Sequence, residues 1–209
     1  MNKQKSKEII SILREIIPNP VCELDYTDAF SLLVAVMLSA QTTDKRVNIV
    51  TPILFSKYKT PLDLANASNS DVKEIIGSLG LANNKATNLI KLANAIHYQY
   101  NDIVPSDFNE LVKLPGVGRK TANVLLAVYF KIPSMPVDTH LHRMAIRLGY
   151  IKNDDDDVLK AEESFKKYIP KEEWIDSHHL LLLFGRYYCK AINPRCSDCK
   201  LKEYCKHYK

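Results

Sequence analysis

Apolar residues recur at the spacing of an α-helix along nearly the whole chain, and this periodicity constrains the fold more than any other feature. One stripe runs from Ile9 to Ile17 and stops at a Pro-Asn-Pro breaker. Asp28 then precedes Ala29–Ala40, an almost continuous apolar stretch that predicts a buried central helix. Further helices are predicted near residues 45–58, 70–78, 83–99, 107–113, 119–130, 139–148, 158–168 and 176–189. No stretch alternates apolar and polar residues as a half-buried strand does, so we expect an all-α fold.

Two pairs of prolines divide the chain. Pro133 and Pro136 follow the apolar helix that ends near Phe130, and Pro18 and Pro20 follow the first helical stripe. A chain of 209 residues has room for one or two compact domains. We therefore expect a domain transition at each proline pair.

The chain begins without the features of a secretory signal, because Met1–Glu8 is polar. Its longest apolar runs, such as Ala29–Ala40, reach about a dozen residues, whereas a helix that spans a bilayer needs about 20. We expect a soluble, cytoplasmic protein. The acidic run Asp154–Asp157 is interpreted as a solvated loop or helix start and receives no function.

The positive charge is concentrated at one end. The chain has 29 Lys and Arg against 24 Asp and Glu, a net charge of +5. Residues 186–209 hold seven of the basic residues and two of the acids, so this segment alone accounts for the excess. Such a distribution indicates a surface that faces a polyanion. The apolar content of 46% is typical of a globular protein and excludes wholesale disorder.

A glycine-containing turn between two predicted helices is a candidate phosphate site. In Leu114–Ala122, Gly116 and Gly118 flank Val117, which permits a very tight turn. The amides of such a turn and the start of the next helix carry partial positive charge and favour an anion, such as a DNA phosphate. A simple turn between helices is the alternative.

Lys120 falls in the first turn of the helix that is predicted to follow. An unperturbed lysine, with a pKa near 10.4, is neutral in only about one of a few thousand molecules at pH 7. A nucleophilic amine therefore needs burial or a nearby positive potential, and this position offers both, with Arg119 adjacent. A plain contact to phosphate is the alternative role.

Asp138 immediately precedes another predicted helix, where it suits an N-cap. A carboxylate here also stabilises positive charge that develops on a sugar, or acts as a base, and capping excludes neither role. His140 and His142 lie two residues apart, so on a helix they point in different directions and make a poor metal pair. We expect polar contacts from them near the site.

Four cysteines near the C-terminus form a candidate metal centre. Cys189, Cys196, Cys199 and Cys205 have the spacing C-x6-C-x2-C-x5-C, whereas Cys22 lies apart and is interpreted as a structural thiol. A [4Fe-4S] cluster and a zinc ion with four cysteine ligands both suit four such thiolates. The spacing favours iron–sulfur, because zinc ribbons prefer two C-x2-C pairs. Disulfides are disfavoured in the expected compartment.

Together these elements resemble the endonuclease III family of helix-hairpin-helix DNA glycosylases, and the resemblance covers essentially the whole chain. Its carriers are Leu114–Val124, Val137–His140 and the cysteine tail, with Leu38–Asp44 and Gly80-Leu81 as lesser carriers. The resemblance implies a two-lobed all-α fold. One lobe is a six-helix barrel at residues 22–131, with the helix-hairpin-helix at about 107–130. The other combines residues 1–21 and 132–209 and holds a [4Fe-4S] cluster in the loop 189–205.

The resemblance also implies the activity and its residues. A bifunctional DNA glycosylase and AP lyase flips an oxidised pyrimidine out of duplex DNA. Lys120 attacks the sugar and forms a Schiff base, and Asp138 acts as base or electrostatic stabiliser. Gln41 and Leu81 fill and wedge the vacated stack, although helix termination and core packing are their alternatives. The implied DNA contacts further include Gly116, Val117, Gly118 and His140, with Lys200, Lys202 and Lys206 forming a basic loop. The protein is expected to act as a monomer on nucleoid DNA.

Three rival functions remain at this stage. A monofunctional mismatch glycosylase of the same superfamily shares the cluster and the aspartate but lacks a lysine at position 120. A non-catalytic DNA-binding module uses the hairpin and the basic tail without bond chemistry, and binds DNA in a salt-dependent way. A ferredoxin-like electron carrier accounts for the cysteines but not for Lys120 or Asp138.

Overall fold

A computed structural model describes residues 1–152 and 157–208. Within these ranges the regular elements are helices and none is a strand, which confirms the all-α prediction. The chain forms two compact units, a central unit of residues 23–130 and a terminal unit of residues 1–22 and 131–209. No described helix is both long enough and apolar enough to cross a membrane.

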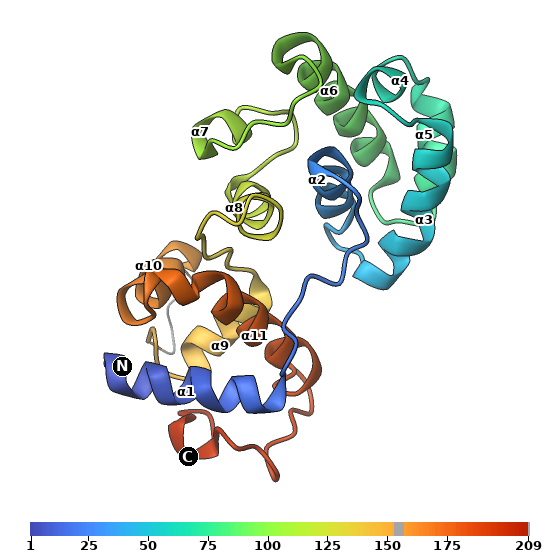
Figure 1. Cartoon of the computed structure of the whole chain (residues 1–209). Coiled ribbons are helices and arrows are strands. Elements are labelled where there is room, and N and C mark those ends of the chain that lie inside the picture. Colours follow the sequence, from blue (N-terminus) through green and yellow to red (C-terminus); the bar gives the residue numbers. More distant parts are fainter. Residues whose placement is uncertain (153–156, 209) are drawn as a thin grey trace. The chain divides into compact units, whose positions relative to one another are not determined.

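The central unit contains the helices labelled α2 to α8 in Figure 1. They are α2 (Ala29–Leu38), α3 (Asp44–Lys57), α4 (Pro61–Ala65), α5 (Asn69–Ile76), α6 (Ala82–Tyr100), α7 (Phe108–Leu111) and α8 (Arg119–Val128). The long helix α6 packs against α4, α5 and α2, and α2 also contacts α3 and α8. The unit is therefore organised around α2 and α6.

Helix α2 is buried on nearly all sides, as its continuous apolar sequence predicts. Asp28 caps its first turn, because its side chain accepts a hydrogen bond from the Ser31 amide while the Ser31 hydroxyl bonds back to the cap. Every residue of the helix except Ala29 and Met37 is buried. Such a helix gains little from its own propensity and is stabilised by the apolar area that its neighbours cover.

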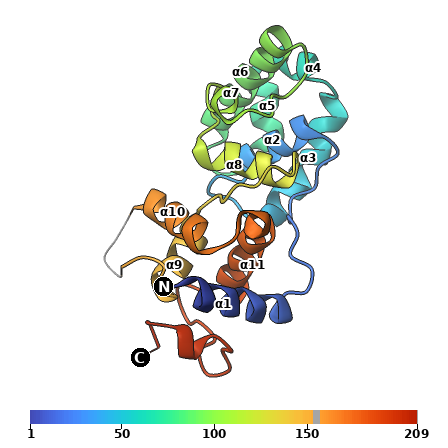
Figure 2. The same cartoon turned by 60° about the vertical axis from the view of Figure 1, so that its left-hand side comes forward.

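The terminal unit is discontinuous in sequence. Its elements are α1 (Lys3–Ile16), α9 (Thr139–Arg147), α10 (Val158–Tyr168), α11 (Trp174–Tyr187) and the short 3₁₀ turns η1 (Lys171–Glu173) and η2 (Lys202–Tyr204). Helix α11 packs against α1 and α9, and α10 packs against α9 (Figure 2). The core between them includes Ile9, Leu141, Phe165 and Leu180. The apolar residues of α1 thus pack into a core whose other members come from residues 135–201.

Two details differ from the sequence expectations, and one expectation is tested only in part. The five-residue helix α4 was not among the predicted helices, because it is too short to show a period. Helix α7 ends at Leu111, because the tight turn that begins at Leu114 leaves no room for another helical turn. Of the acidic run, residues 154–156 lie outside the described residues, whereas Asp157 caps α10 through the Leu159 amide.

Candidate functional site

The glycine turn between α7 and α8 is tight and closely packed. Gly116 has a φ of +76°, a conformation that glycine adopts without strain. A Cβ atom at this position would lie 2.6 Å from Met37 Cε and 3.2 Å from Asn88 Cβ. The turn therefore rests directly against α2 and α6, and Gly116 is required both for the backbone angle and for the close approach.

Helix α8 begins without a side-chain cap. Gly118 is its N-cap residue, and no side chain bonds to the first amides of the helix. A Cβ atom at Gly118 would have open space around it, with no atom within 4 Å. The guanidinium of Arg119 lies 5.3 Å above the Phe108 ring centroid. The start of α8 thus presents the positive end of a helix and a guanidinium, which together suit a phosphate oxygen.

Val117 occupies the middle of this turn but does not face outward. Its side chain is 5% exposed, and its amide donates a 3.1 Å hydrogen bond to the Leu114 carbonyl. Side chain and amide therefore both serve the turn, and a DNA contact from Val117 would have to use its main-chain carbonyl. The start of α8 and the main chain of Gly116 and Gly118 remain the candidate contacts to a phosphate.

Lys120 is the second residue of α8, and its side chain is exposed. The burial that the sequence analysis allowed is thus absent, and the helix N-terminus and Arg119 remain as local sources of positive potential. No described carboxylate of the central unit pairs with its amine. An exposed amine without an ion-pair partner is accessible to an electrophile.

Asp138 lies in the terminal unit, where it caps α9. One carboxylate oxygen, Oδ1, accepts hydrogen bonds from the His140 amide at 2.8 Å and the Leu141 amide at 2.9 Å. The residue is half-buried. The structure therefore shows the capping role and fixes the orientation of the carboxylate through two backbone amides.

His140 packs inside the terminal unit. A Cβ atom on Gly185 of α11 would lie 3.2 Å from His140 Cβ, so the two helices approach closely here. The His140 ring contacts Arg143, with Nδ1 3.2 Å from Nη2, and Arg143 donates a 2.6 Å hydrogen bond to the Gly185 carbonyl. The histidine is half-buried.

Gln41 and Leu81 both stand in exposed loops of the central unit and share a strained backbone. Their φ angles are 55° and 63°, in the left-handed region that non-glycine residues seldom occupy. Leu81 is 54% exposed, which excludes core packing as its role. Gln41 lies three residues beyond the last residue of α2 and is also exposed. Two residues with exposed side chains thus share an unusual, left-handed backbone conformation.

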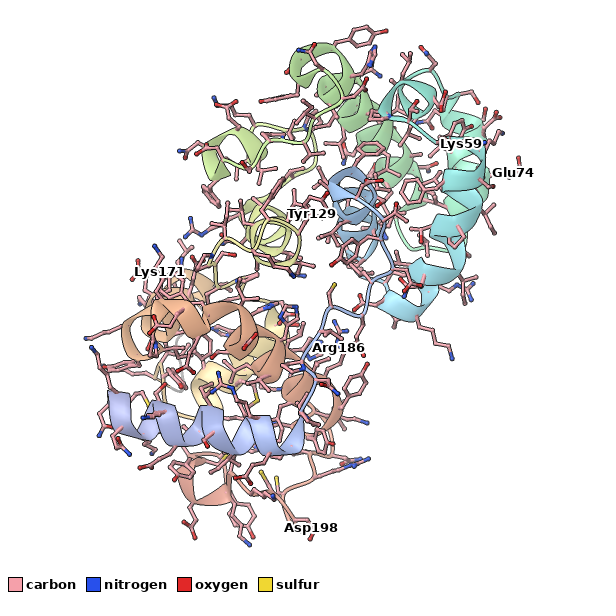
Figure 3. All side chains as sticks on the ribbon, viewed as in Figure 1. Lys59, Glu74, Tyr129, Lys171, Arg186 and Asp198 are labelled. Atoms are coloured by element: carbon pink, nitrogen blue, oxygen red, sulfur yellow. The ribbon has the colours of Figure 1, made fainter. Side chains whose placement is uncertain are left out.

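The four C-terminal cysteines line one small cavity, together with Arg147, Tyr188 and neighbouring residues. All four thiols are free and half-buried. Arg147 Nη1 donates hydrogen bonds to Cys189 Sγ at 3.1 Å and to the Lys190 carbonyl at 2.8 Å. Figure 3 shows sulfur atoms of this loop close to the labelled Asp198. The loop therefore gathers the cysteines around a common space.

The cysteines share this cavity without forming a closed ligand set. Among the described residues, no three Cys, His, Asp or Glu side chains converge closely enough to hold a metal ion. Four thiols that line one cavity are the ligand type of both a zinc site and a [4Fe-4S] cluster.

Burial and the neighbouring cysteines raise the pKa of the Cys199 thiol. The three other members of the set act on it, which agrees with their common cavity. Of the basic residues in this loop, Lys200 pairs with Glu15 of α1 at 3.2 Å, and both side chains are exposed. Such an exposed ion pair contributes little to stability and leaves the lysine available to an anion.

Two buried cations were missed by the sequence analysis. Lys85 is 7% exposed in α6, and Arg147 is 8% exposed at the end of α9. A signal for Lys85 exists in the sequence, since it shares a helical stripe with Leu89, Leu92 and Ile96. Lysine on such a stripe usually reaches solvent with its amine, so the pattern alone does not identify a buried one.

The chain is similar to proteins with established names over nearly its whole length. Residues 34–171 match the HhH-GPD superfamily of base excision DNA repair proteins. Endonuclease III of Bacillus subtilis (strain 168) is 45% identical over 206 residues, which cover 99% of this chain and 94% of that protein. Endonuclease III of Rickettsia felis is 44% identical and covers 100% of this chain and 97% of that protein.

A solved structure extends this similarity to three dimensions. The structure of a trapped endonuclease III–DNA covalent intermediate superimposes with a TM-score of 0.96 at 45% identity. The match covers 100% of this chain and 97% of that chain. The chain therefore shares its whole fold with an endonuclease III that has been trapped covalently on DNA.

Proposed function

Because this chain belongs to the endonuclease III family of base excision repair DNA glycosylases with AP lyase activity, we propose that it excises oxidised pyrimidines with Lys120 as nucleophile. The observation that carries this proposal is the exposed Lys120 side chain in the first turn of α8, beside the glycine turn at the start of that helix. A phosphate bound at that turn would bring a sugar of the same strand within reach of the amine.

Lys120 supplies both steps of the reaction. Its neutral amine attacks C1′ of the damaged nucleotide, and the bond between C1′ and the base breaks with its electron pair leaving on the base. The amine loses a proton and the sugar ring opens to give a Schiff base. Removal of a C2′ proton then expels the 3′ phosphate by β-elimination. Water finally hydrolyses the Schiff base and releases Lys120.

Asp138 acts as base or electrostatic stabiliser in this proposal. Positive charge develops on the sugar as the base departs, and a nearby carboxylate lowers the energy of that state. The two amide hydrogen bonds to Oδ1 hold the carboxylate in one orientation, so it needs no rearrangement during the reaction. Capping and catalysis therefore use the same side chain.

The remaining DNA contacts follow from exposure and backbone geometry. Gln41 and Leu81 are the exposed residues proposed to occupy the space of the flipped nucleotide, at an unstacking cost of a few kcal/mol. Gly116 and Gly118 contact the phosphate backbone through their main chain. His140 is proposed as a further DNA contact, with its ring held by Arg143 and its helix packed closely against α11.

Cys189, Cys196, Cys199 and Cys205 are proposed to hold a [4Fe-4S] cluster. Their common cavity, their free thiols and the hydrogen bond from Arg147 to Cys189 Sγ support this assignment. The cluster would supply a structural cross-link for the loop, and Lys200, Lys202 and Lys206 beside the cysteines would face DNA. Metal analysis and the visible spectrum of the purified protein test the assignment.

The two units correspond in this proposal to a barrel domain with the helix-hairpin-helix at about 107–130 and to an iron–sulfur domain. Double-stranded DNA with an oxidised pyrimidine or an abasic site is the partner. We further propose that the protein acts as a monomer on nucleoid DNA in the cytoplasm. Size-exclusion chromatography of the free and DNA-bound protein tests the monomer.

The decisive experiment incubates the protein with a duplex that contains one thymine glycol and adds borohydride. Borohydride reduces the Schiff base, so a covalent protein–DNA band is expected from the native chain and none from Lys120→Gln. Lys113→Gln is the matched control, because Lys113 is an exposed lysine near the same turn that pairs with Glu110.

A trapped band from Lys120→Gln would refute the nucleophile. Absence of any band from the native chain on thymine glycol, with a band on an abasic site, would retain the lyase chemistry and assign another lesion. Absence of both bands would refute the proposed function.

A further inference from the structure

Lys85 is a buried cation whose amine, among the described residues, bonds to a carbonyl and a hydroxyl rather than to a carboxylate. Its side chain is 7% exposed on the inner face of α6, where Ala86 and Leu89 are also buried. Burial lowers the pKa of its amine, and no neighbouring carboxylate offsets that effect. Lysine in the first turn of a helix is also disfavoured by the positive helix end. Because burying a charged amine is unfavourable, we expect specific hydrogen bonds to hold the Lys85 side chain in this place.

Two hydrogen bonds from the amine provide those contacts. Lys85 Nζ donates to the Leu38 carbonyl at 2.9 Å and to Thr42 Oγ1 at 3.0 Å. Leu38 is the last residue of α2, so its carbonyl belongs to the group that lacks a partner within the helix. The ammonium therefore caps α2 from another helix, at the end where the helix dipole favours a cation.

The two contacts of Lys85 enclose the strained loop that carries Gln41. Leu38 and Thr42 lie on either side of Gln41, whose φ is 55°. The Lys85 backbone amide bonds to the Leu81 carbonyl at 3.0 Å, and Leu81 has a φ of 63°. A Cβ atom on Gly80 would lie 3.8 Å from the Gln41 carbonyl oxygen, so the two loops are neighbours.

We propose that Lys85 is a positioning residue that fastens the Gln41 loop to the Leu81 turn, so that both side chains enter the DNA stack as one preformed unit. This inference rests on the proposed function of Gln41 and Leu81. Each strained loop alone would relax towards ordinary backbone angles, because left-handed conformations of non-glycine residues are unfavourable. Lys85 joins them through its side chain on one loop and its backbone on the other.

The proposal predicts a specific kinetic defect in Lys85→Met. Methionine fills the same apolar space but cannot donate a hydrogen bond, so the Gln41 loop is released. Loss of charge-assisted hydrogen bonds is expected to reduce kcat/KM for thymine glycol excision from duplex DNA about 10- to 100-fold. Borohydride trapping on a single-stranded abasic oligonucleotide requires no filled stack and should change less than about twofold. Lys91→Met is the matched control, an exposed lysine of the same helix.

A double-mutant cycle separates positioning from general destabilisation. In the background Gln41→Ala with Leu81→Ala, Lys85→Met should cause little further loss, because the residues that it positions are already removed. If the losses instead multiply, or if single-stranded trapping falls in parallel with excision, Lys85 has a purely structural role and the proposal is overturned.

The same measurements distinguish this proposal from the proposed function. If the native chain neither excises thymine glycol nor traps on an abasic site, the function itself fails. If the native chain performs both reactions and Lys85→Met performs them equally well, the function stands and the positioning role of Lys85 fails.

Discussion

Arg147 reaches from the end of α9 to Cys189, to whose Sγ atom its Nη1 donates a 3.1 Å hydrogen bond. The same nitrogen bonds to the Lys190 carbonyl at 2.8 Å, and the Arg147 carbonyl accepts a 2.7 Å hydrogen bond from the Lys206 amide. One buried residue thus contacts both ends of the cysteine loop.

Replacement of Arg147 should loosen the proposed metal centre. Arg147→Met removes the donors to the Cys189 sulfur and the Lys190 carbonyl, and outer-shell partners of this kind typically contribute 10- to 100-fold to metal affinity or activity. We expect lower iron content per chain and faster bleaching of the visible absorbance in air. Cys199→Ser, which removes one of the proposed ligands, should lower the iron content and speed the bleaching further. Full iron content in Arg147→Met would contradict a supporting role for this residue.

The two glycines of the turn should respond differently to alanine. Gly116→Ala introduces a side chain at a φ of +76° and against Met37, so we expect a loss of about 2–4 kcal/mol in the free energy of unfolding. Gly118→Ala meets open space at an ordinary backbone angle and should stay within about 0.5 kcal/mol of the native chain. Urea denaturation measures both, and equal losses would show that the turn is not packed as described.

Asp138 combines capping with the proposed electrostatic role, and two substitutions separate them. Asp138→Asn keeps a good N-cap but removes the charge, so stability should change little while excision falls by about two orders of magnitude or more. Asp138→Ala should lose about 1 kcal/mol of stability in addition. Thermal unfolding and single-turnover excision are the measurements. Native excision rates in Asp138→Asn would exclude the charge from catalysis.

Alkaline pH should destabilise the terminal unit through Tyr150. Burial raises the pKa of this phenol to about 12, and its oxygen lies 2.6 Å from Ser6 Oγ. The contribution of the neutral phenol is complete below the unfolded value near 10 and is lost as the pH rises towards 12. Between these values the unfolded chain binds fewer protons, so the free energy of unfolding falls by up to about 3 kcal/mol.

Tyr150→Phe should remove this alkaline loss, although it costs about 1 kcal/mol or more at neutral pH because Ser6 loses its partner. Tyr98→Phe, at an exposed tyrosine, is the control and should leave the pH dependence unchanged. Urea denaturation between pH 8 and 12 measures the difference. An unchanged slope in Tyr150→Phe would assign the alkaline loss to other groups.

The fold was largely predictable from the sequence because long helices repeat their apolar pattern several times. Asp28 before α2 shows how a cap and a periodic stretch together locate a helix end. The five residues of α4 contain barely one turn, so no period reveals them. Apolar periodicity thus identifies long elements and misses those whose ends depend on local turns.

The candidate site was predictable in its chemistry but not in its environment. Lys120 and Asp138 stand out because of their neighbours in sequence, yet the exposure of Lys120 depends on how its helix packs. Val117 lies in the predicted turn, and only the structure shows that it faces inward. The partners of Lys85 lie 43 and 47 residues away, a distance over which local sequence carries no information.

Helix α9 is a short rigid rod with a different task at each end. Its nine residues span about 13 Å, with Asp138 as the cap of one end and Arg147 anchoring the cysteine loop at the other. A displacement of α9 would therefore move the Asp138 cap and the Arg147 anchor together, so one helix sets the geometry of both the carboxylate and the cysteine loop.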